Sequence, residues 1–238
     1  MKFVVLGGTG AMGKFVVRDL FETVKDAEIV IAARDVDAVQ KYAASFKSSR
    51  VTGKRVDLLH IEQTAQTLQG ADVCINCTNY YYNLHAMKAC LLAGCHYVDL
   101  GGLYHMTKKQ LQFDRLFKKK DLLAILGCGS TPGITNVMIN HGAASFTTID
   151  SIHIRFGGHD WAKQKNHFVL PYTAYTLFDE FTDQAVVLER RRIKLVAPLS
   201  GQETYRFPQP VGKKTCFYTL HSELATLPQT YYDKGLRA

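Results

Sequence analysis

The glycine-rich turn Gly7–Gly13 constrains the fold of this chain more than any other feature. It follows the apolar run Lys2–Leu6 and precedes a helical pattern over Ala11–Val24. A continuous apolar run is typical of a parallel strand that is buried on both faces. The order strand, glycine turn, helix begins a βαβ unit, the context in which a G-x-G-x-x-G pattern indicates a dinucleotide site. We expect one face of the helix to carry Phe15, Val16, Leu20 and Val24.

Strands and helices continue to alternate through the first half of the chain. Further strands are predicted at Glu28–Ala33, Val51–Val56, Asp72–Cys77, His96–Leu100 and Leu122–Leu126. Helices are predicted between them at Asp35–Phe46, Ile61–Leu68, Leu84–Leu92 and Thr107–Lys119. Regular alternation of this kind predicts an α/β fold, a Rossmann doubly wound parallel sheet with helices on both faces.

The pattern changes after about residue 145, where shorter segments follow. Ser151–Phe156 alternates like a half-exposed strand, and Thr173–Phe181 has a helical pattern. Shorter strands are predicted at Ala185–Leu188, Ile193–Val196 and Thr215–Thr219. We therefore expect an NAD(P)-binding Rossmann domain over residues 1–130. Residues 131–238 are expected to form a second α+β domain, with an antiparallel sheet, for substrate binding and dimerisation.

The glycines of the turn each have a physical role at a dinucleotide site. Gly8 permits the tight turn, Gly10 lets the backbone approach a pyrophosphate, and Gly13 lets the helix pack closely on the strand. The helix N-terminus adds N–H groups and a partial positive charge. The predicted cofactor-binding residues of this turn are Gly8, Thr9, Gly10, Ala11, Met12 and Gly13.

The residues after the second strand decide which dinucleotide binds. An arginine there suits the 2′-phosphate of NADP, whereas an acidic residue suits the 2′-hydroxyl of NAD. Arg34 follows the strand directly and favours NADP, while Asp35 keeps NAD possible. Asp35 has a second interpretation, as the cap of the following helix. Asp57, after the third strand, is predicted to lie near the adenine.

Three segments follow later strands and are predicted to meet at the carboxyl edge of the sheet, where ligands of open α/β sheets bind. They are Cys77–Tyr80, Asp99–Gly102 and Gly127–Gly133. In the third segment, Thr131 can cap a helix that has Pro132 at its first position. The N-terminus of that helix is suited to bind a substrate carboxylate or the nicotinamide amide.

The motifs GGTGAMG, HYVDLGG and GCGSTPGITNV together resemble the saccharopine dehydrogenase family. That family includes saccharopine reductases, carboxynorspermidine dehydrogenases and lysine 6-dehydrogenases. The resemblance extends over essentially the whole chain. It implies NAD(P)-dependent hydride transfer at a carbon–nitrogen bond of an amino acid, with a nearby group that exchanges a proton.

The resemblance and the carboxyl-edge rule together give a set of candidate residues. Asp99 and Cys128 are the predicted catalytic residues, although Asp99 has an equally strong interpretation as a loop cap. Cys77, Thr78 and Asn79 are predicted to contact the cofactor on its nicotinamide side. Substrate contacts are predicted for Tyr97, Gly129, Thr131, Pro132 and Asn136, with Asn136 expected to orient its turn. His159, His167 and His221 are weaker candidates for a substrate carboxylate.

Composition limits the other classes of function. The net charge of +8 and pI near 9.1 admit nucleic acid, but the basic runs are short and lack interleaved aromatics, so no nucleic-acid partner is expected. No apolar run approaches the roughly 20 residues of a membrane span. Six scattered cysteines without a secretory signal indicate reduced thiols and a cytoplasmic protein, with no metal site. A homodimer is the ordinary expectation.

One departure from the resembled family leaves a second hypothesis open. Family members usually run well beyond 238 residues, so the chain is expected to be either a fragment or a protein with a reduced substrate domain. A reduced domain would permit cofactor binding without turnover. The competing hypothesis is therefore an NADP-binding sensor or scaffold that has lost catalysis.

Overall fold

The computed structural model describes residues 1–159 and 173–238. The chain divides into two compact units, Met1–Gly129 and Ser130–Ala238. Within the described part of the chain, every helix is too short or too polar to cross a membrane.

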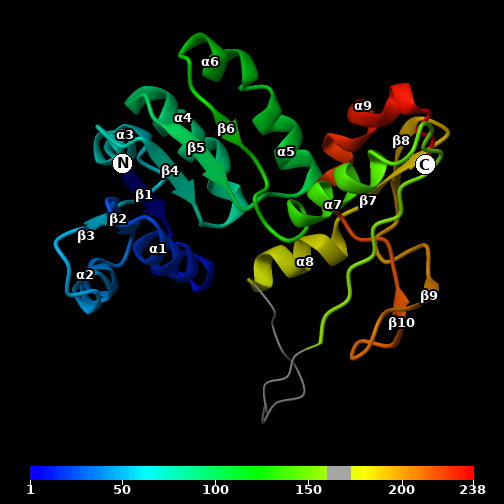
Figure 1. The fold of residues 1–238 in the computed structure, drawn as a ribbon, viewed down its shortest axis with the longest axis horizontal. Helices are drawn as coiled ribbons and strands as arrows, with labels where there is room; N and C mark the ends of the chain where they lie inside the picture. The colour runs from blue at the N-terminus through cyan, green and yellow to red at the C-terminus, as the bar shows by residue number, and fades with distance from the viewer. Residues whose placement is uncertain (160–172) are drawn as a thin grey trace. The chain divides into compact units, whose positions relative to one another are not determined.

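The first unit is built on a parallel sheet of six strands in the order β3-β2-β1-β4-β5-β6 (Figure 1). The strands are β1 (Lys2–Leu6), β2 (Glu28–Ala33), β3 (Val51–Arg55), β4 (Val73–Asn76), β5 (His96–Asp99) and β6 (Ala124–Ile125). The chain moves outward from β1 to β3 and then returns to place β4 on the other side of β1. The loops after β1 and β4 therefore flank the point at which the strand order reverses, which is the usual ligand position in such sheets.

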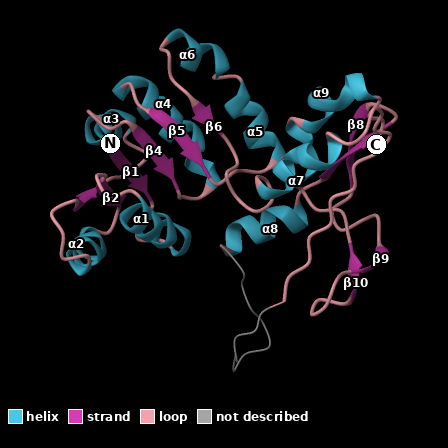
Figure 2. Cartoon of the chain, in the orientation of Figure 1, coloured by secondary structure: helices cyan, strands magenta, loops and turns pink. Residues whose placement is uncertain are grey.

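Helices cover both faces of this sheet, as Figure 2 shows. They are α1 (Ala11–Thr23), α2 (Val36–Ser45), α3 (Ile61–Leu68), α4 (Asn83–Ala93), α5 (Tyr104–Leu111) and α6 (Asp114–Lys119), with a 3-10 turn η1 (Tyr80–Tyr82) before α4. Val17 of α1 and Val39 of α2 pack on one face of the sheet with Val5. Leu68 of α3 and Met87 of α4 belong to the core on the opposite face. The predicted doubly wound Rossmann fold is confirmed.

Two expectations about the helices of the first unit were wrong. The predicted helix Thr107–Lys119 is two helices, because backbone hydrogen bonds at Gln112 and Phe113 run to carbonyls three positions back and interrupt the α-helical ladder. Phe15 was expected on the packed face of α1, but it is 67% exposed. The buried residues of α1 are Gly13 and Val17, one turn apart.

The second unit combines helices with two antiparallel pairs of strands. Its helices are α7 (Ile134–Ala143), α8 (Ala174–Thr182) and α9 (Leu227–Tyr231), with 3-10 turns η2 (Glu223–Ala225) and η3 (Tyr232–Lys234). The strands are β7 (Ala185–Glu189), β8 (Arg192–Val196), β9 (Glu203–Arg206) and β10 (Lys213–Cys216). β7 pairs with β8 and β9 with β10, each as a two-stranded sheet, so the expected antiparallel pairing takes the form of two separate hairpins. Its apolar core includes Ala143, Ile149, Leu227, Tyr231 and Leu236.

The alternating segment Ser151–Phe156 is not a strand, contrary to expectation. Ile152 and Ile154 do pack against the apolar core of the second unit, which explains the alternation. The backbone N–H of Ile152 donates to the carbonyl of Ala238 at 2.9 Å, but the segment forms no ladder with a neighbouring strand. The alternating pattern therefore predicted correctly which side chains are half-buried, but it predicted strand pairing that the segment does not have.

Close packing at Gly13 gives the first testable prediction. A Cβ at Gly13 would lie 2.2 Å from the carbonyl oxygen of Gly7 and 2.7 Å from Cα of Gly8, both backbone atoms. Gly13→Ala must therefore displace α1 from the glycine turn, and we expect a loss of about 1–3 kcal/mol in the free energy of unfolding. Urea unfolding measures this loss.

Gly142→Ala in α7 is the matched control, because a Cβ there would meet no described atom within 4 Å beyond its chain neighbours and the backbone of its own helix. Alanine at a helical position that tolerates it leaves stability unchanged or raises it by up to about 1 kcal/mol. A Gly13→Ala protein as stable as the wild type would show that α1 does not pack on the turn as described.

Candidate functional site

The glycine turn after β1 forms a backbone cradle at the start of α1. Gly7 has a φ of +72°, and its carbonyl accepts from the N–H of Gly10 at 2.9 Å. Gly10 is the N-cap of α1, where no side chain caps the helix and the first turn holds no acidic residue. Gly10, Ala11 and Met12 are exposed, so their backbone is accessible. A pyrophosphate fits such a turn, because it accepts from backbone N–H groups and interacts favourably with the helix dipole.

The loop after β4 lies directly against this cradle. A Cβ at Gly7 would lie 2.9 Å from Cγ2 of Thr78 and 3.1 Å from the carbonyl carbon of Cys77. The loops on the two sides of the strand-order reversal therefore touch. Burial, followed by the charges of Cys74 and Asp99, raises the pKa of Cys77 to about 12, so this thiol stays protonated at neutral pH.

Asn79 and Asp35 both act as helix caps. The Asn79 side chain accepts from the N–H of Tyr81 at 3.0 Å at the start of η1. The Asp35 side chain accepts from the N–H of Ala38 at 3.0 Å at the start of α2. These contacts match the capping interpretation of Asp35 and place its carboxylate on the helix. A direct contact of either residue with the cofactor remains a prediction.

Arg34 is exposed immediately after β2, and a second arginine, Arg55, ends the neighbouring strand β3. In the register of the sheet, Ala33 of β2 pairs with Arg55 at the end of β3. Arg34 and Arg55 therefore lie at the carboxyl ends of neighbouring strands, with Arg34 one residue beyond the position that pairs with Arg55. Sequence reasoning missed Arg55, although the ends of the two predicted strands would have brought it next to Arg34.

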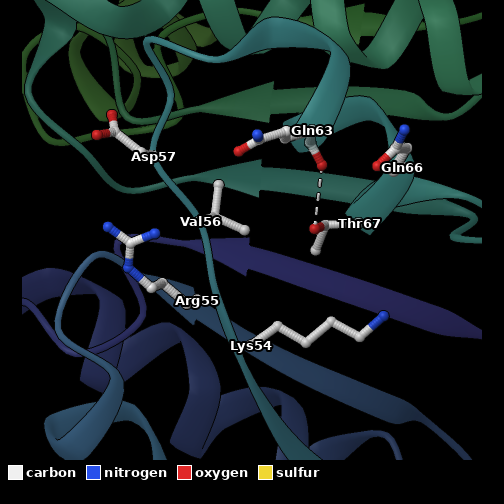
Figure 3. Close-up of a pocket in the computed structure, with 7 residues that line it drawn as sticks. All are labelled: Lys54, Arg55, Val56, Asp57, Gln63, Gln66 and Thr67. Atoms are coloured by element: carbon white, nitrogen blue, oxygen red, sulfur yellow. Dashed lines mark hydrogen bonds between the residues drawn. The ribbon is translucent and has the colours of Figure 1, made fainter.

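A polar pocket of about 410 Å³ lies between the end of β3 and α3 (Figure 3). It is lined by Lys54, Arg55, Val56, Asp57, Gln63, Gln66 and Thr67. The Arg55 and Asp57 side chains lie on one side of this segment, and Lys54 extends the other way (Figure 3). The Asp57 side chain accepts from the N–H of Leu59 at 3.1 Å. Its position near the adenine remains a prediction.

The carboxylate of Asp99 is the centre of a buried polar network at the end of β5. Asp99 is 0% exposed. Its Oδ1 accepts from the backbone N–H groups of Gly101 at 2.9 Å and Gly127 at 2.7 Å. Its Oδ2 accepts from the Tyr97 hydroxyl at 2.9 Å and the Gln110 amide at 2.6 Å.

These four donors fill both acceptor positions of each oxygen. The described residues thus leave no acceptor position of Asp99 for a substrate amine. We therefore replace the predicted acid/base role of Asp99 with the loop-capping interpretation. Tyr97 belongs to the same buried network, which places its hydroxyl on Asp99 instead of on a substrate.

Two buried asparagines extend the network to the loop after β4. The Asn76 amide donates to Asn83 at 2.9 Å and to the Tyr97 hydroxyl at 3.2 Å. The Asn76 oxygen accepts from both the backbone N–H and the hydroxyl of Thr78, at 3.2 and 2.6 Å. The Asn83 amide donates to the carbonyl of Gly101 at 3.2 Å. Thr78, the residue against the glycine cradle, is thus fixed by the same network that holds the loops after β5 and β6.

Asn76, Asn83 and Gln110 were missed by sequence reasoning. Each is 1% exposed. Asn76 ends an apolar strand and Asn83 begins an apolar helix, whereas Gln110 lies near the buried Thr107 in the polar helix α5. A buried polar residue nearly always has hydrogen-bond partners, so polar residues inside apolar patterns were the available signal for the two asparagines.

Cys128 is the exposed thiol at the carboxyl edge of the first unit. Its backbone N–H donates to the carbonyl of Asp99 at 2.8 Å. Desolvation, followed by the negative charge of Asp99, raises the pKa of the Cys128 thiol above its ordinary value of 9.0. The thiol is therefore protonated at neutral pH and can donate a proton there. Gly129 follows it, and its predicted substrate contact remains a prediction.

The helix start predicted at Thr131 and Pro132 was wrong. α7 begins at Ile134, with Gly133 as N-cap at a φ of +127°. Proline disfavours the helical conformation in the residue before it, and a φ of +127° cannot belong to a helix, so the helix starts only after Gly133. Asn136 orients this turn, because its side-chain oxygen accepts from the N–H of Gly133 at 3.1 Å.

The three candidate histidines have different surroundings. His221 Nδ1 lies 3.2 Å from the Thr131 hydroxyl within the second unit. His159 is exposed, and His167 lies outside the described residues. Substrate contacts of Thr131, Pro132 and the histidines remain predictions. Residues 1–159 and 173–238 contain no group of three or more metal-ligating side chains.

Comparisons with known proteins relate the chain to a family and to several relatives. The sequence model of the family described as "Saccharopine dehydrogenase NADP binding domain" matches residues 3–125, slightly more than half of the chain. A carboxyaminopropylagmatine dehydrogenase from Synechocystis is 26% identical over 95% of this chain and 58% of its own length. The structure of saccharopine dehydrogenase (L-Glu forming) from Saccharomyces cerevisiae superimposes with a TM-score of 0.68 at 13% identity.

That superposition covers 99% of this chain and 53% of the yeast enzyme. The chain thus spans between half and three fifths of the relatives it matches. An NADPH-dependent quinone oxidoreductase from Escherichia coli is more distant, with a TM-score of 0.42 at 17% identity over 59% of this chain and 53% of that one.

The position of Arg34 gives a prediction about cofactor choice. A charged hydrogen bond to the 2′-phosphate contributes about 1.5–3 kcal/mol, so Arg34→Ala should weaken NADPH binding about 10- to 100-fold. NADH lacks that phosphate, and its affinity should change less than about threefold. Fluorescence titration of both cofactors measures the two effects.

Arg115→Ala, an exposed arginine on α6, is the control for the loss of one positive charge from the same unit. It should leave both affinities unchanged. Equal losses of NADPH and NADH affinity in Arg34→Ala would remove Arg34 from the 2′-phosphate.

Proposed function

This chain belongs to the saccharopine dehydrogenase NADP-binding family, and we propose that it is an NADP-dependent dehydrogenase or reductase acting on a carbon–nitrogen bond. The proposed substrate is an amino acid or an amino-acid-derived amine of the saccharopine, lysine, carboxynorspermidine or carboxyaminopropylagmatine type. The name of the Synechocystis relative supports this substrate class. Family membership confirms the resemblance drawn from the motifs, and the family's description as NADP-binding supports NADP as the cofactor.

The observation that carries the proposal is the contact between the loops after β1 and β4, which flank the point where the strand order reverses. The backbone cradle at Gly8, Gly10 and Gly13 would hold the pyrophosphate, and Arg34 would bind the 2′-phosphate. Thr78 touches the cradle and is fixed by the Asp99 network, so it is suited to position the nicotinamide end. Bound NADP supplies the hydride chemistry, and the protein supplies binding and orientation.

Proton transfer is the second requirement of the reaction. When hydride reaches the carbon of a C=N bond, the nitrogen gains electron density and takes a proton. Because Asp99 has no free acceptor position, Cys128 is the remaining predicted acid/base residue. Its thiol is protonated at neutral pH, so it can donate a proton when the C=N bond is reduced and take it back in the reverse direction.

We also propose a cytoplasmic homodimer in which residues 131–238 serve substrate binding and dimerisation. All six cysteines are free thiols, which suits a reducing compartment. Two-fold symmetric dimers are the commonest oligomers of soluble proteins.

Turnover is the experiment that tests the proposed function. The protein is incubated with NADP⁺ or NADPH and a panel of saccharopine, lysine, carboxynorspermidine and carboxyaminopropylagmatine, and absorbance of the reduced nicotinamide is followed. We expect turnover with at least one member and a preference for NADP over NAD. In Cys128→Ala, kcat should fall about 100-fold or more while NADPH affinity is unchanged.

Tight NADPH binding without turnover of any substrate would overturn the enzyme assignment. It would favour the sensor or scaffold hypothesis instead.

A further inference from the structure

Glu223 is a buried carboxylate in the second unit with one oxygen unsatisfied. It is the first residue of η2 and is 2% exposed. Its Oε1 accepts from the Thr135 hydroxyl at 2.9 Å. Its Oε2 is buried and has no hydrogen-bond partner within residues 1–159 and 173–238.

Thr135 is the second residue of α7, so its contact brings the Glu223 carboxylate to the first turn of that helix. The partial positive charge of a helix N-terminus favours a carboxylate there. That interaction and one hydroxyl offset only part of the cost of burying a charge, which is several kcal/mol for an unpaired ion. The free-energy cost of burying Oε2 without a hydrogen bond is not offset by any contact within the described part of the chain.

Among the residues that the structure describes, Glu223 is surrounded by polar groups but has no cation paired with it. The Ser222 hydroxyl is also buried without a partner among the described residues, and Ser222 is 3% exposed. Neighbouring His221 contacts the Thr131 hydroxyl at 3.2 Å, close to the start of α7. None of the ion pairs found within residues 1–159 and 173–238 involves Glu223.

We propose that Glu223 binds a cationic nitrogen of the substrate, an ammonium or a guanidinium group, next to the first turn of α7. The inference rests on the proposed function, whose substrates carry such nitrogens. A carboxylate only accepts hydrogen bonds, so the group that completes Oε2 must be a donor. A charged N–H donor forms the stronger, charge-assisted bond and also neutralises the buried charge.

Probe binding tests this proposal without requiring turnover. Agmatine, 1,4-diaminobutane and neutral 1,4-butanediol are titrated by calorimetry into the NADP⁺-saturated protein. We expect the two cationic probes to bind and the diol not to bind. Equal affinity of the two cations would identify an ammonium ligand, and much tighter agmatine binding would identify the guanidinium.

Glu223→Gln keeps the size of the side chain and removes its charge. Loss of one member of a buried charge pair should lower the binding affinity for the cationic probes at least about tenfold. It should raise KM for the substrate by a similar factor. Asp233→Asn is the control, because it removes an exposed negative charge ten residues away in the same unit. It should leave both values unchanged.

Thermal melting without ligand separates a binding role from a structural one. Removing an unpaired buried charge should leave the melting temperature of Glu223→Gln unchanged or higher. A marked fall in melting temperature with unchanged probe affinity would overturn the proposal. If Glu223→Gln does not fold, Glu223→Asp keeps the charge but withdraws the carboxylate, and unaltered probe affinity in that variant would also overturn it.

The two proposals fail in different ways. Wild-type protein that binds cationic probes through Glu223 but turns over no substrate contradicts the proposed function alone. Turnover that is unaffected by Glu223→Gln, or wild-type protein that binds neither cation, contradicts the inference about Glu223 alone.

Discussion

The hydrogen bonds around the buried Asp99 carboxylate hold together the part of the molecule that can bind a cofactor. Its donors come from β5 itself, from the loop after β5, from α5 and from the loop after β6. A single charged group therefore fixes several chain segments that are far apart in the sequence. Removing any one donor would leave a charged acceptor buried and unsatisfied, at a cost of about 1–3 kcal/mol or more.

Burial and the Asp99 charge both favour the protonated forms of neighbouring groups. Burial first, and the Asp99 charge among the further causes, raises the pKa of Tyr97, Cys77 and Cys128. These three groups therefore hold their protons at neutral pH and can act as proton donors. Reduction of a C=N bond needs a proton on nitrogen, and this electrostatic arrangement is compatible with that chemistry.

Much of the first unit could be predicted from the sequence because its signals are local. Apolar runs, helical periodicity and the glycine turn each depend on residues close together in the chain, and Asp35 was correctly considered as a cap. The role of Asp99 could not be predicted, because the sequence places it at a strand end without revealing that Gly101, Gln110 and Gly127 supply its donors. Its loop-capping interpretation was available but had equal weight.

The second unit was less predictable for a related reason. Alternation in Ser151–Phe156 reports which side chains are half-buried, but pairing depends on a partner strand elsewhere in the chain. The contact between Thr135 and Glu223 joins residues 88 positions apart, and no local pattern marks it. Buried polar contacts of this kind become visible only in three dimensions.

Amide hydrogen exchange at Gly101 and Gly127 tests the central claim, that Asp99 holds the carboxyl edge together, most directly. Both glycines lie outside strands and helices, yet their N–H groups donate to Asp99 Oδ1. The account predicts that both amides exchange slowly, at rates close to those of amides within β5. Exchange as fast as at Gly70, in an exposed turn, would show that the Asp99 carboxylate does not hold these loops and would contradict the account.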